Sequence, residues 1–467
     1  MIDLYFKLVF RGYTVGSFVC TFSSVNSPFE KMKGFKVVCS VPTDDILLSC
    51  GNDKCVEVIS ASKESLRELN AKLLSIQSDV AHCLSDELIR RRLTVQASKE
   101  INALLLSTFG PSCSTAGIFP SLVFEGLSSA ERERADPLLS SSCHFPGGVS
   151  TSVGKRLTTM CHDLLHLKGE EALARSSQIS RTCCEILSRH SFLCQKERSS
   201  VTVPMNVMRQ SECGSVYLSC GDHCHSILCA HYAKLVELFT GSSEEMDGRI
   251  FVLLERYAAL GGDADPLSER GWHGSVPSRV LSSLRESLQL NCECFASPFN
   301  TFSSFYCSAF PDTDCYFGSV GNFFQNNFVQ GTFEANPPFD HSVVLALARR
   351  ANELLSASEL PLCFVVFVPI ADNGKQLTSS LAFDSELRNG GFLVADQLIK
   401  GSAAPYVDGG QQCRGSALFV TRFSTQLFVL QNPSHAITFN ATKAIAAAVH
   451  SWAEIDTSSF KKRERDP

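Results

Sequence analysis

Phe333-Glu334-Ala335-Asn336-Pro337-Pro338-Phe339-Asp340 is typical of a buried strand that breaks into a stiff polar turn. The two prolines have a fixed φ and no N–H, and Pro337 also disfavours the α conformation at Asn336. Asn336 Oδ1 and the Pro337 carbonyl are suited to accept two N–H bonds from an exocyclic amino group on a flat ring. Phe339 is placed to stack on the face of that ring. An ordinary loop is the alternative, because Asn-Pro and Pro-Pro are common in turns.

Apolar strand-like runs alternate with amphipathic helical segments from about residue 201 onward. The predicted strands are 215–218, 292–296, 332–335, 362–369, 416–420 and 426–430, and the predicted helices are 231–240, 250–260, 280–288, 302–310, 341–355 and 441–453. Such alternation is typical of an α/β fold, in which helices cover the faces of a sheet. Ligands of such sheets bind beyond the carboxyl ends of the strands, and the turn at Asn336 follows such an end.

Four parts are predicted along the chain. They are a β-rich region at 1–60, a helical region at 61–200 with a flexible stretch near 111–155, an α/β domain at 201–456, and a basic tail at 457–467. Ser62 and Glu64 predict the start of the first helix, because such residues occur at helix N-termini.

Composition and charge exclude several classes of protein. Of the 467 residues, 44% are hydrophobic and 19% are charged, which excludes a mainly disordered chain. The net charge of −6 argues against coating of long nucleic acid and favours a short piece in a local pocket. The 21 cysteines form no compact framework and Lys7 and Arg11 interrupt any signal-peptide core, so a reducing compartment is expected. The longest apolar run, 361–371, is too short to span a bilayer, so we expect no membrane contact.

Two further clusters suggest chemistry of their own. Cysteines and histidines between Cys220 and His231 suggest zinc, but their spacing matches no paired ligand motif and several would lie on one continuing helix. We therefore expect no metal site. The Arg90-Arg91-Arg92 triplet is a phosphate contact or, as the alternative, a solvated helix face. The sequence contains neither a glycine-rich phosphate loop nor a G-x-S-x-G elbow, which argues against kinases, NTPases, ordinary dinucleotide enzymes and α/β-hydrolases.

Two polar turns precede the corner at Asn336 and predict a cofactor site. In a Rossmann-like sheet, the first strand–helix turn cradles a nucleoside cofactor, and an acid from a later strand end binds its ribose. The candidate cofactor residues are Phe295, Ser297, Pro298, Asn300, Asp312, Asp314, Phe317, Gly318 and Glu334. Asp312 is favoured over Asp314 for the ribose, and Glu334 is either a cofactor contact or a structural residue.

Three runs within this region resemble a known family. They are CFASPFN at 294–300, YCSAFPDTD at 306–314 with YFGS at 316–319, and FEANPPF at 333–339. These runs look like the catalytic core of the phosphorylated-CTD-interacting factor family, the mRNA cap-specific adenosine N6-methyltransferases. The resemblance covers roughly residues 205–435. It implies a Rossmann-like class I methyltransferase domain, S-adenosylmethionine as the methyl donor, and a 5′-capped RNA as the acceptor.

The same resemblance implies site residues. Asn336, Pro337, Pro338 and Phe339 correspond to the catalytic corner of the family. The implied mechanism is direct methyl transfer to N6 of the adenosine that follows an N7-methylguanosine cap. Orientation of the amine supplies most of the rate gain, and no general base is obligatory.

The chain also departs from the family pattern. Animal members carry a WW module with two spaced tryptophans that reads polymerase tails, whereas this chain has only Trp272 and Trp452, so no such contact is expected. Asp340 directly after the corner is expected to alter the substrate pocket. By region, the candidates for stacking on the cap are Tyr406, Arg414 and Phe423.

The expected function is therefore N6-methylation of the cap-adjacent adenosine of mRNA. The alternatives are an N6-adenine methyltransferase that acts on internal RNA or DNA, a catalytically silent cap- or RNA-binding protein with the same fold, and a zinc-dependent interaction module around Cys220–His231. The basic residues at 461–465 favour a nuclear location, with a frayed terminus and a cytoplasmic location as alternatives. The sequence predicts nothing about the oligomeric state.

Overall fold

Two compact units, Met1–Ser60 and Ala61–Pro467, make up the chain in the computed structural model. The structure describes residues 3–10, 13–21, 35–39, 46–50, 54–77, 80–128, 136–139, 152–198, 206–262, 274–370, 378–401, 404–414, 418–420 and 423–455. The predicted basic tail at 457–467 lies outside these residues. In the first unit, β1 (Asp3–Phe10) pairs antiparallel with β2 (Tyr13–Thr21), and β3 (Phe35–Cys39), β4 (Ile46–Cys50) and β5 (Lys54–Ser60) form an antiparallel meander.

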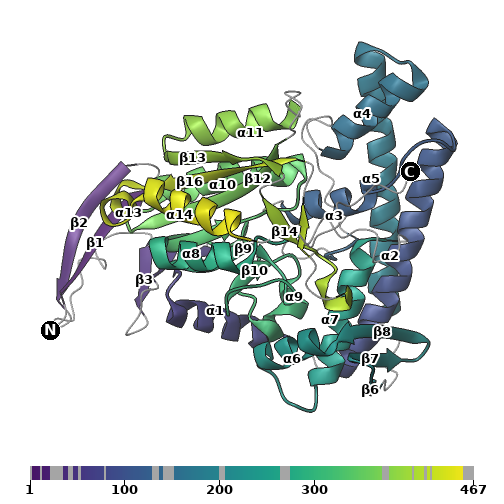
Figure 1. The fold of residues 1–467 in the computed structure, drawn as a ribbon, viewed down its shortest axis with the longest axis horizontal. Coiled ribbons are helices and arrows are strands. Elements are labelled where there is room, and N and C mark those ends of the chain that lie inside the picture. Colours follow the sequence, from purple (N-terminus) through teal and green to yellow (C-terminus); the bar gives the residue numbers. More distant parts are fainter. Residues whose placement is uncertain are drawn as a thin grey trace. The chain divides into compact units, whose positions relative to one another are not determined.

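Helices dominate the first part of the second unit. They are α1 (Lys63–Ser75), α2 (Val80–Phe109), α3 (Ile118–Leu127), α4 (Ser152–Leu165) and α5 (Gly169–Arg198), and α2 and α5 run side by side (Figure 1). Ser62 caps α1 as predicted, because its hydroxyl accepts a hydrogen bond from the Ser65 amide at 3.1 Å.

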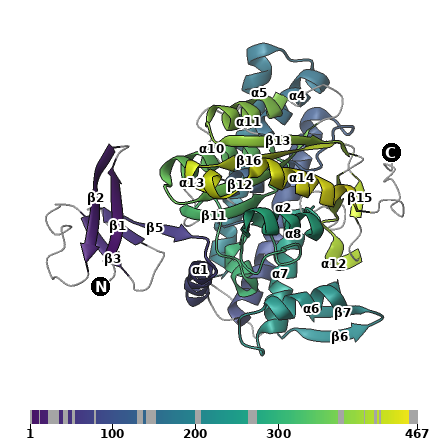
Figure 2. The ribbon, with the colours of Figure 1, turned by 60° about the vertical axis from the view of Figure 1, so that its left-hand side comes forward.

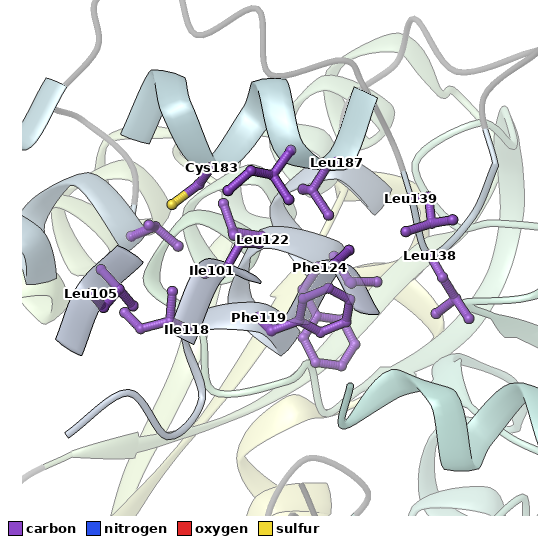
Figure 3. Close-up of a cluster of buried hydrophobic side chains, with 14 of the residues drawn as sticks. Ile101, Leu105, Ile118, Phe119, Leu122, Phe124, Leu138, Leu139, Cys183 and Leu187 are labelled. Carbon is purple, nitrogen blue, oxygen red and sulfur yellow. The ribbon is translucent and has the colours of Figure 1, made fainter. Parts of the chain in front are cut away.

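The core of this helical layer is built around α3, the short helical piece within the stretch predicted to be flexible. Figure 3 shows Ile118, Phe119, Leu122 and Phe124 of α3 packed among side chains of α2 and α5. Nine of the ten residues of α3 are buried. The same cluster of buried side chains includes residues of the following region, among them Leu260 and Val343, so the two regions share a hydrophobic core. The domain boundary predicted near residue 200 stays a prediction.

Six strands of the second unit form the sheet at the centre of its α/β part. Their order is β10 (Tyr306–Ser308), β9 (Leu290–Ala296), β11 (Phe328–Ala335), β12 (Leu362–Ile370), β16 (Ser424–Gln431) and β13 (Leu393–Ile399). Strands β10, β9, β11 and β12 are parallel, and β16 runs antiparallel to both of its neighbours. The predicted α/β class is confirmed as a mixed sheet with helices.

Two helices cover one face of this sheet. Figures 1 and 2 both show α8 (Ser278–Leu288) and α14 (Ala441–Ala453) side by side across the strands. Cys363, Val365 and Phe367 alternate along β12 and pack against these helices, as the two-residue period of a strand requires. The remaining elements are α6 (Cys229–Leu238), α7 (Met246–Leu260), α9 (Pro311–Asp314), α10 (His341–Ala357), α11 (Thr378–Asn389), α12 (Gln411–Arg414), α13 (Pro433–Thr438) and the pair β14 (Pro405–Val407) with β15 (Leu418–Val420).

Two predicted elements were wrong. The helix predicted at 302–310 contains strand β10, whose three residues are all buried. A short strand that is buried on both faces of a parallel sheet shows no alternation, so its period did not separate strand from helix. The Cys220–His231 segment is not one continuing helix: β7 (Ser215–Cys220) and β8 (His223–Leu228) form a hairpin beside β6 (Met208–Glu212), and α6 follows.

Within the described residues, no helix is both long enough and apolar enough to cross a membrane.

Candidate active site

The carboxyl ends of β9 and β11 lie side by side at a change of direction in the sheet. From β9 the chain continues to β10 on one side, and it then crosses to β11 on the other side. Such a topological switch point opens a crevice between the two strand ends, which is where ligands of open α/β sheets bind. A cavity lies at this point, with an empty volume of about 660 Å³ that includes solvent at its mouth.

Segments that are far apart in the sequence line this cavity. They are Phe124 and Leu127 of α3, Tyr257 and Leu260 of α7, Gly274, Cys294 to Ser297 and Asn300 from the end of β9 and the turn after it, Ser308 and Ala309 at the end of β10, Asn322 to Phe324, Asn336 and Pro338 of the corner, and Val343 of α10. The walls are mainly apolar and aromatic, with a few hydroxyl and amide groups. No carboxylate is among these lining residues. The cavity therefore suits a flat, weakly polar ligand group.

Asn336 supplies a buried hydrogen-bond acceptor to this cavity. Its side chain is only 8% exposed, and its Nδ2 donates to the Gly274 carbonyl at 2.9 Å. Because a carbonyl can only accept, the nitrogen must face Gly274, and Oδ1 must point the other way. Among the described residues, Oδ1 has no partner. An unsatisfied buried oxygen costs free energy, so its place beside a cavity indicates that a ligand donor completes it.

The rest of the predicted corner surrounds this amide. Pro338 lines the cavity, and its carbonyl accepts from the Asp340 amide at 2.6 Å. The ring of Phe339 meets Tyr406 and Phe423 edge to face, with centroids 6.3 and 5.6 Å apart. The structure thus brings two of the predicted cap residues to the corner.

Their surroundings differ, however. Tyr406 is 1% exposed, and its hydroxyl pairs with Thr425 Oγ1 at 2.9 Å, so its ring is already enclosed. Phe423 is half-buried. Arg414 ends α12, and its side chain lies outside the described residues.

The turn after β9 is held by its own side chains. Asn300 Oδ1 accepts from the Ser297 amide at 2.7 Å and from the Ser297 hydroxyl at 3.0 Å. Lys234 Nζ donates to the carbonyls of Phe299 and Thr301. Of the four residues predicted in this turn, Phe295, Ser297 and Asn300 line the cavity, whereas Pro298 lies within the turn but not in the cavity wall.

Two buried carboxyl groups lie next to each other in the sheet. Glu293 of β9 and Glu334 of β11 are register partners on adjacent strands. Glu293 Oε2 accepts from the amides of Phe302 and Ser303 and so fixes the loop after the turn. Burial, and then the neighbouring Glu293, raises the pKa of Glu334 well above its usual range. Glu334 is not among the residues of the cavity wall.

The two acids of the second predicted turn have protein partners. Both oxygens of Asp312 accept from the Arg256 guanidinium, at 2.9 and 2.8 Å. Asp314 Oδ2 accepts from the Tyr257 hydroxyl at 2.7 Å, and burial raises the pKa of Asp314 to about 7. Neither acid lines the cavity, but Tyr257 does, so the geometry brings Asp314 closer to the site than Asp312. The ribose assignment to Asp312 stays a prediction.

Phe317 and Gly318 hold this turn in place by packing. Phe317 is fully buried in a hydrophobic cluster. Gly318 has a φ of 100°, and a Cβ at this position would lie 2.2 Å from the Ser304 carbonyl oxygen. Only glycine fits both restrictions. The structure gives these two residues a structural role beside the cavity.

Sequence reasoning missed the walls contributed by α3, α7 and the segment 322–324. Phe124, Leu127 and Tyr257 lie in helical segments whose apolar spacing is that of any core helix, so nothing local marked them. Asn322 joins two of these walls, since its Nδ2 donates to the Leu127 carbonyl and its Oδ1 accepts from the Phe324 amide. The sequence did offer one signal for this wall. The Asn322-Phe323-Phe324 run places an amide next to two aromatic residues, which is a combination that binding sites use.

The suspected zinc cluster has another explanation. His223 Nδ1 and His225 Nε2 both lie within 2.9 Å of Glu255 Oε1, which is fully buried in α7. Among the residues that the structure describes, no group of three or more His, Cys, Asp or Glu side chains is arranged to hold a metal.

Known proteins match the part of the chain that contains this cavity. Residues 228–409 match the family model described as the phosphorylated CTD interacting factor 1 WW domain. A mouse and a human protein, each named mRNA (2'-O-methyladenosine-N(6)-)-methyltransferase, are 42% identical to the chain over 121 residues. Residues 228–409 are therefore similar to the phosphorylated CTD interacting factor family. The aligned part is 26% of this chain and 17% of each relative, so the chain matches about a sixth of the relatives' length.

The part of the chain that matches the phosphorylated CTD interacting factor family runs from α6 to β14. It contains β9, β10, β11 and the corner at Asn336. Of the two tryptophans in the sequence, only Trp272 falls within it. The family match therefore covers the sheet strands and the corner that build the cavity.

Proposed function

We propose that this chain is an S-adenosylmethionine-dependent methyltransferase that modifies N6 of the cap-adjacent adenosine of capped mRNA. The observation that carries the proposal is the buried Asn336 Oδ1, which has no partner among the described residues and belongs to a side chain of the cavity wall. The names of the mouse and human relatives support N6 of an mRNA adenosine as the target. A nuclear location remains part of this proposal.

The fold fits a Rossmann-like class I methyltransferase domain. Four adjacent parallel strands with a switch point between β9 and β11 are the arrangement that binds nucleosides in doubly wound sheets. The cavity wall offers aromatic rings at Phe295 and Phe323 and hydroxyl groups at Ser297 and Ser308. Rings of this kind stack on an adenine, and hydroxyls pair with a ribose. S-adenosylmethionine bound there would supply an electrophilic methyl group.

The chain's own contribution is to orient a poor nucleophile. The lone pair of an adenine amine is delocalised into the ring, so the amine must be turned and held before it attacks. Asn336 Oδ1 accepts one N–H, and the Pro337 carbonyl accepts the other, which directs the lone pair away from both. With the thioether as leaving group, N6 would gain the methyl group as the sulfur–methyl bond breaks. The amine would then become more acidic, these two hydrogen bonds would strengthen, and the surplus N6 proton would pass to solvent. The gain comes from orientation and from dipoles already in place.

A second candidate function keeps the chemistry and changes the substrate. The chain would then methylate internal adenines of RNA or DNA. The enclosed ring of Tyr406 favours this candidate, because a ring that already packs on Phe339 and Trp452 offers little face for a methylated guanine. A silent cap- or RNA-binding protein is the third candidate, and the open acceptor at Asn336 argues against it.

Mass spectrometry of methylated products separates these candidates. We expect a capped, adenosine-initiated RNA to gain N6-methyladenosine at its first nucleotide. The same RNA with a 5′-triphosphate, and an RNA with adenosine only at internal positions, serve as comparisons. Equal turnover on capped and uncapped RNA would reject the cap assignment, and no product on any of them would reject the enzyme.

The variant Asn336→Ala tests the residue that carries the proposal. We expect kcat to fall by about 100-fold or more, the range seen when one preorganised polar group is removed from an active site. The Kd for S-adenosylmethionine, measured by calorimetry, should change little, because the lost group faces the substrate amine. Asn432→Ala is the matched control. Asn432 is also buried and also donates to backbone carbonyls, but it lies at the amino end of β12, opposite the cavity.

A further inference from the structure

Asp340 connects the catalytic corner to a different part of the chain. It is 3% exposed, and it begins α10 directly after Phe339. Its Oδ1 accepts from the amides of Ser342 and Val343, at 2.9 and 3.4 Å, as an N-cap residue does. The same oxygen also accepts from the Ser152 hydroxyl at 2.7 Å. Ser152 is the first residue of α4, so one carboxyl group serves two helices.

A second carboxyl group completes this cluster. Glu125 of α3 accepts from the Val153 amide of α4 at 2.9 Å and from the Ser342 hydroxyl of α10 at 3.3 Å. Ser342 Oγ in turn accepts from the Ser152 amide at 2.8 Å. The N-termini of α4 and α10 therefore face each other, and two acids offset the partial positive charge of both. We call Glu125, Ser152, Asp340 and Ser342 the helix-start cluster.

The helix-start cluster joins the elements that form the cavity wall. α3 contributes Phe124, next to Glu125, and α10 contributes Val343, three residues after Asp340. Between Asp340 and Asn336 the chain has two prolines and a packed phenylalanine. Such a segment has few soft dihedrals, so a shift at Asp340 is passed on to the Asn336 amide. The position of Oδ1 relative to the cavity thus depends on where α4 holds Asp340.

We propose that Asp340 is a positioning residue for methyl transfer, and that it acts by tying the Asn336 corner to α3 and α4 through the helix-start cluster. The inference rests on the proposed function. An ordinary N-cap would stabilise α10 without any effect on turnover beyond the loss of folded protein. An N-cap needs only the hydrogen bonds to the first amides of its own helix. The additional hydrogen bond from Ser152, which is 188 residues away in sequence, ties Asp340 to a second helix.

The test compares four variants by kcat, by KM, by thermal unfolding and by amide hydrogen exchange of the peptide that spans the corner. Asp340→Ala removes both the cap and the tie to α4. Asp340→Asn keeps an oxygen acceptor for both. Ser152→Ala removes the hydroxyl that ties Asp340 to α4 and leaves the Asp340 cap of α10. Asn440→Ala is the matched control, because Asn440 caps α14 in the same way by accepting from the Lys443 amide at 2.9 Å, away from the cavity.

For Asp340→Ala we expect kcat to fall by about 10- to 100-fold, because a displacement of about 1 Å at reacting groups costs up to that factor. The Kd for S-adenosylmethionine should stay within about threefold, and exchange at the corner should rise. Asp340→Asn should recover most of the kcat, since asparagine caps helices about as well as aspartate. Ser152→Ala should lower kcat and raise exchange at the corner. Asn440→Ala should lower the Tm and leave kcat and exchange at the corner unchanged.

The proposal is overturned if Asp340→Ala keeps a kcat within about twofold of wild type and loses about as much Tm as Asn440→Ala. Asp340 would then act only as the N-cap of α10. If Asp340→Ala does not fold, Ser152→Ala decides, and unchanged kcat and exchange in it overturn the proposal. If wild-type protein methylates no capped RNA, the proposed function fails. The exchange comparison between Ser152→Ala and Asn440→Ala then decides whether the tie holds the corner.

Discussion

At the scale of single residues, the side-chain amide of Asn336 matters because it has two unlike ends. Its nitrogen is held by the Gly274 carbonyl, and its oxygen is left for a ligand. A carboxylate of the same shape has no donor for Gly274, so two acceptors would face each other. Unlike an ionised carboxylate, an amide satisfies the carbonyl and still presents an acceptor to an amine.

The variant Asn336→Asp tests this argument through its pH dependence. When ionised, the introduced carboxylate would repel the Gly274 carbonyl, whereas the protonated acid can donate to it and keep its other oxygen as acceptor. Burial favours the protonated form and raises the pKa of such an acid. We therefore expect the residual kcat of Asn336→Asp to rise as the pH is lowered, relative to wild type. Parallel pH–rate profiles for the two proteins would contradict the two-ended role of the amide.

At the scale of elements, the α9 turn supports the cavity from behind. Asp314 ends α9 and accepts from Tyr257, and Tyr257 lines the cavity. Thr313 Oγ1 donates to the other oxygen of Asp314 at 2.9 Å. Asp314 is fully buried, and burial is the main reason that its pKa is raised to about 7.

This raised pKa predicts how stability depends on pH. The carboxyl group of Asp314 has an ordinary pKa of 3.8, so between about pH 4 and 7 the folded protein holds a proton that the unfolded chain has lost. Asp314 therefore makes the free energy of unfolding decrease as the pH rises through this window, by up to about 1.4 kcal/mol per pH unit. Asp314→Asn removes this contribution. Urea unfolding at several pH values measures this effect. From pH 4 to 7 the free energy of unfolding of the variant should rise relative to that of wild type, and above pH 7 the difference between the two should stay constant.

Elements with a clear period were predictable, and those without one were not. The helix at 341–355 and the strand at 362–369 match α10 and β12 to within a few residues. By contrast, β10 has three buried residues and no alternation, and the sequence favoured a helix there. The prediction of one helix after Cys220 was wrong, because short Cys and His spacing does not distinguish the hairpin of β7 and β8 from a helix.

At the scale of the second unit, a buried ion-pair network connects α2 of the helical layer to α7 and α9. Arg256 of α7 binds Glu87 of α2 with two hydrogen bonds of 2.8 Å and also binds Asp312 of α9. Arg90, which was expected to lie on a solvated face or to contact phosphate, is buried and pairs with Glu87 and, at 2.9 Å, with Asp136. The expectation failed because sequence alone did not show which helix covers Arg90.

Removal of one member of this network should destabilise the whole unit. Arg256 and Glu87 have side chains that are 1% and 2% exposed. We expect Arg256→Ala to lower the free energy of unfolding by about 3–5 kcal/mol, because Glu87 and Asp312 both lose their buried guanidinium partner. The double variant Arg256→Ala/Glu87→Ala should lose less than the sum of the two single variants. Denaturant unfolding of all four proteins measures this coupling, and strict additivity would show that the pair is not energetically linked.

The sequence by itself determined the corner at Asn336, the α/β class and the turn after β9, because these depend on local rules. Proline fixes φ, strands and helices have their own periods, and a turn closes on its own side chains. Only the tertiary structure decided that α3 and α7 wall the cavity, that Asp312 pairs with Arg256, and that Asp340 reaches Ser152. These contacts join residues up to 188 positions apart. Their partners are chosen by how buried faces and charges fit together in three dimensions, which no local pattern records.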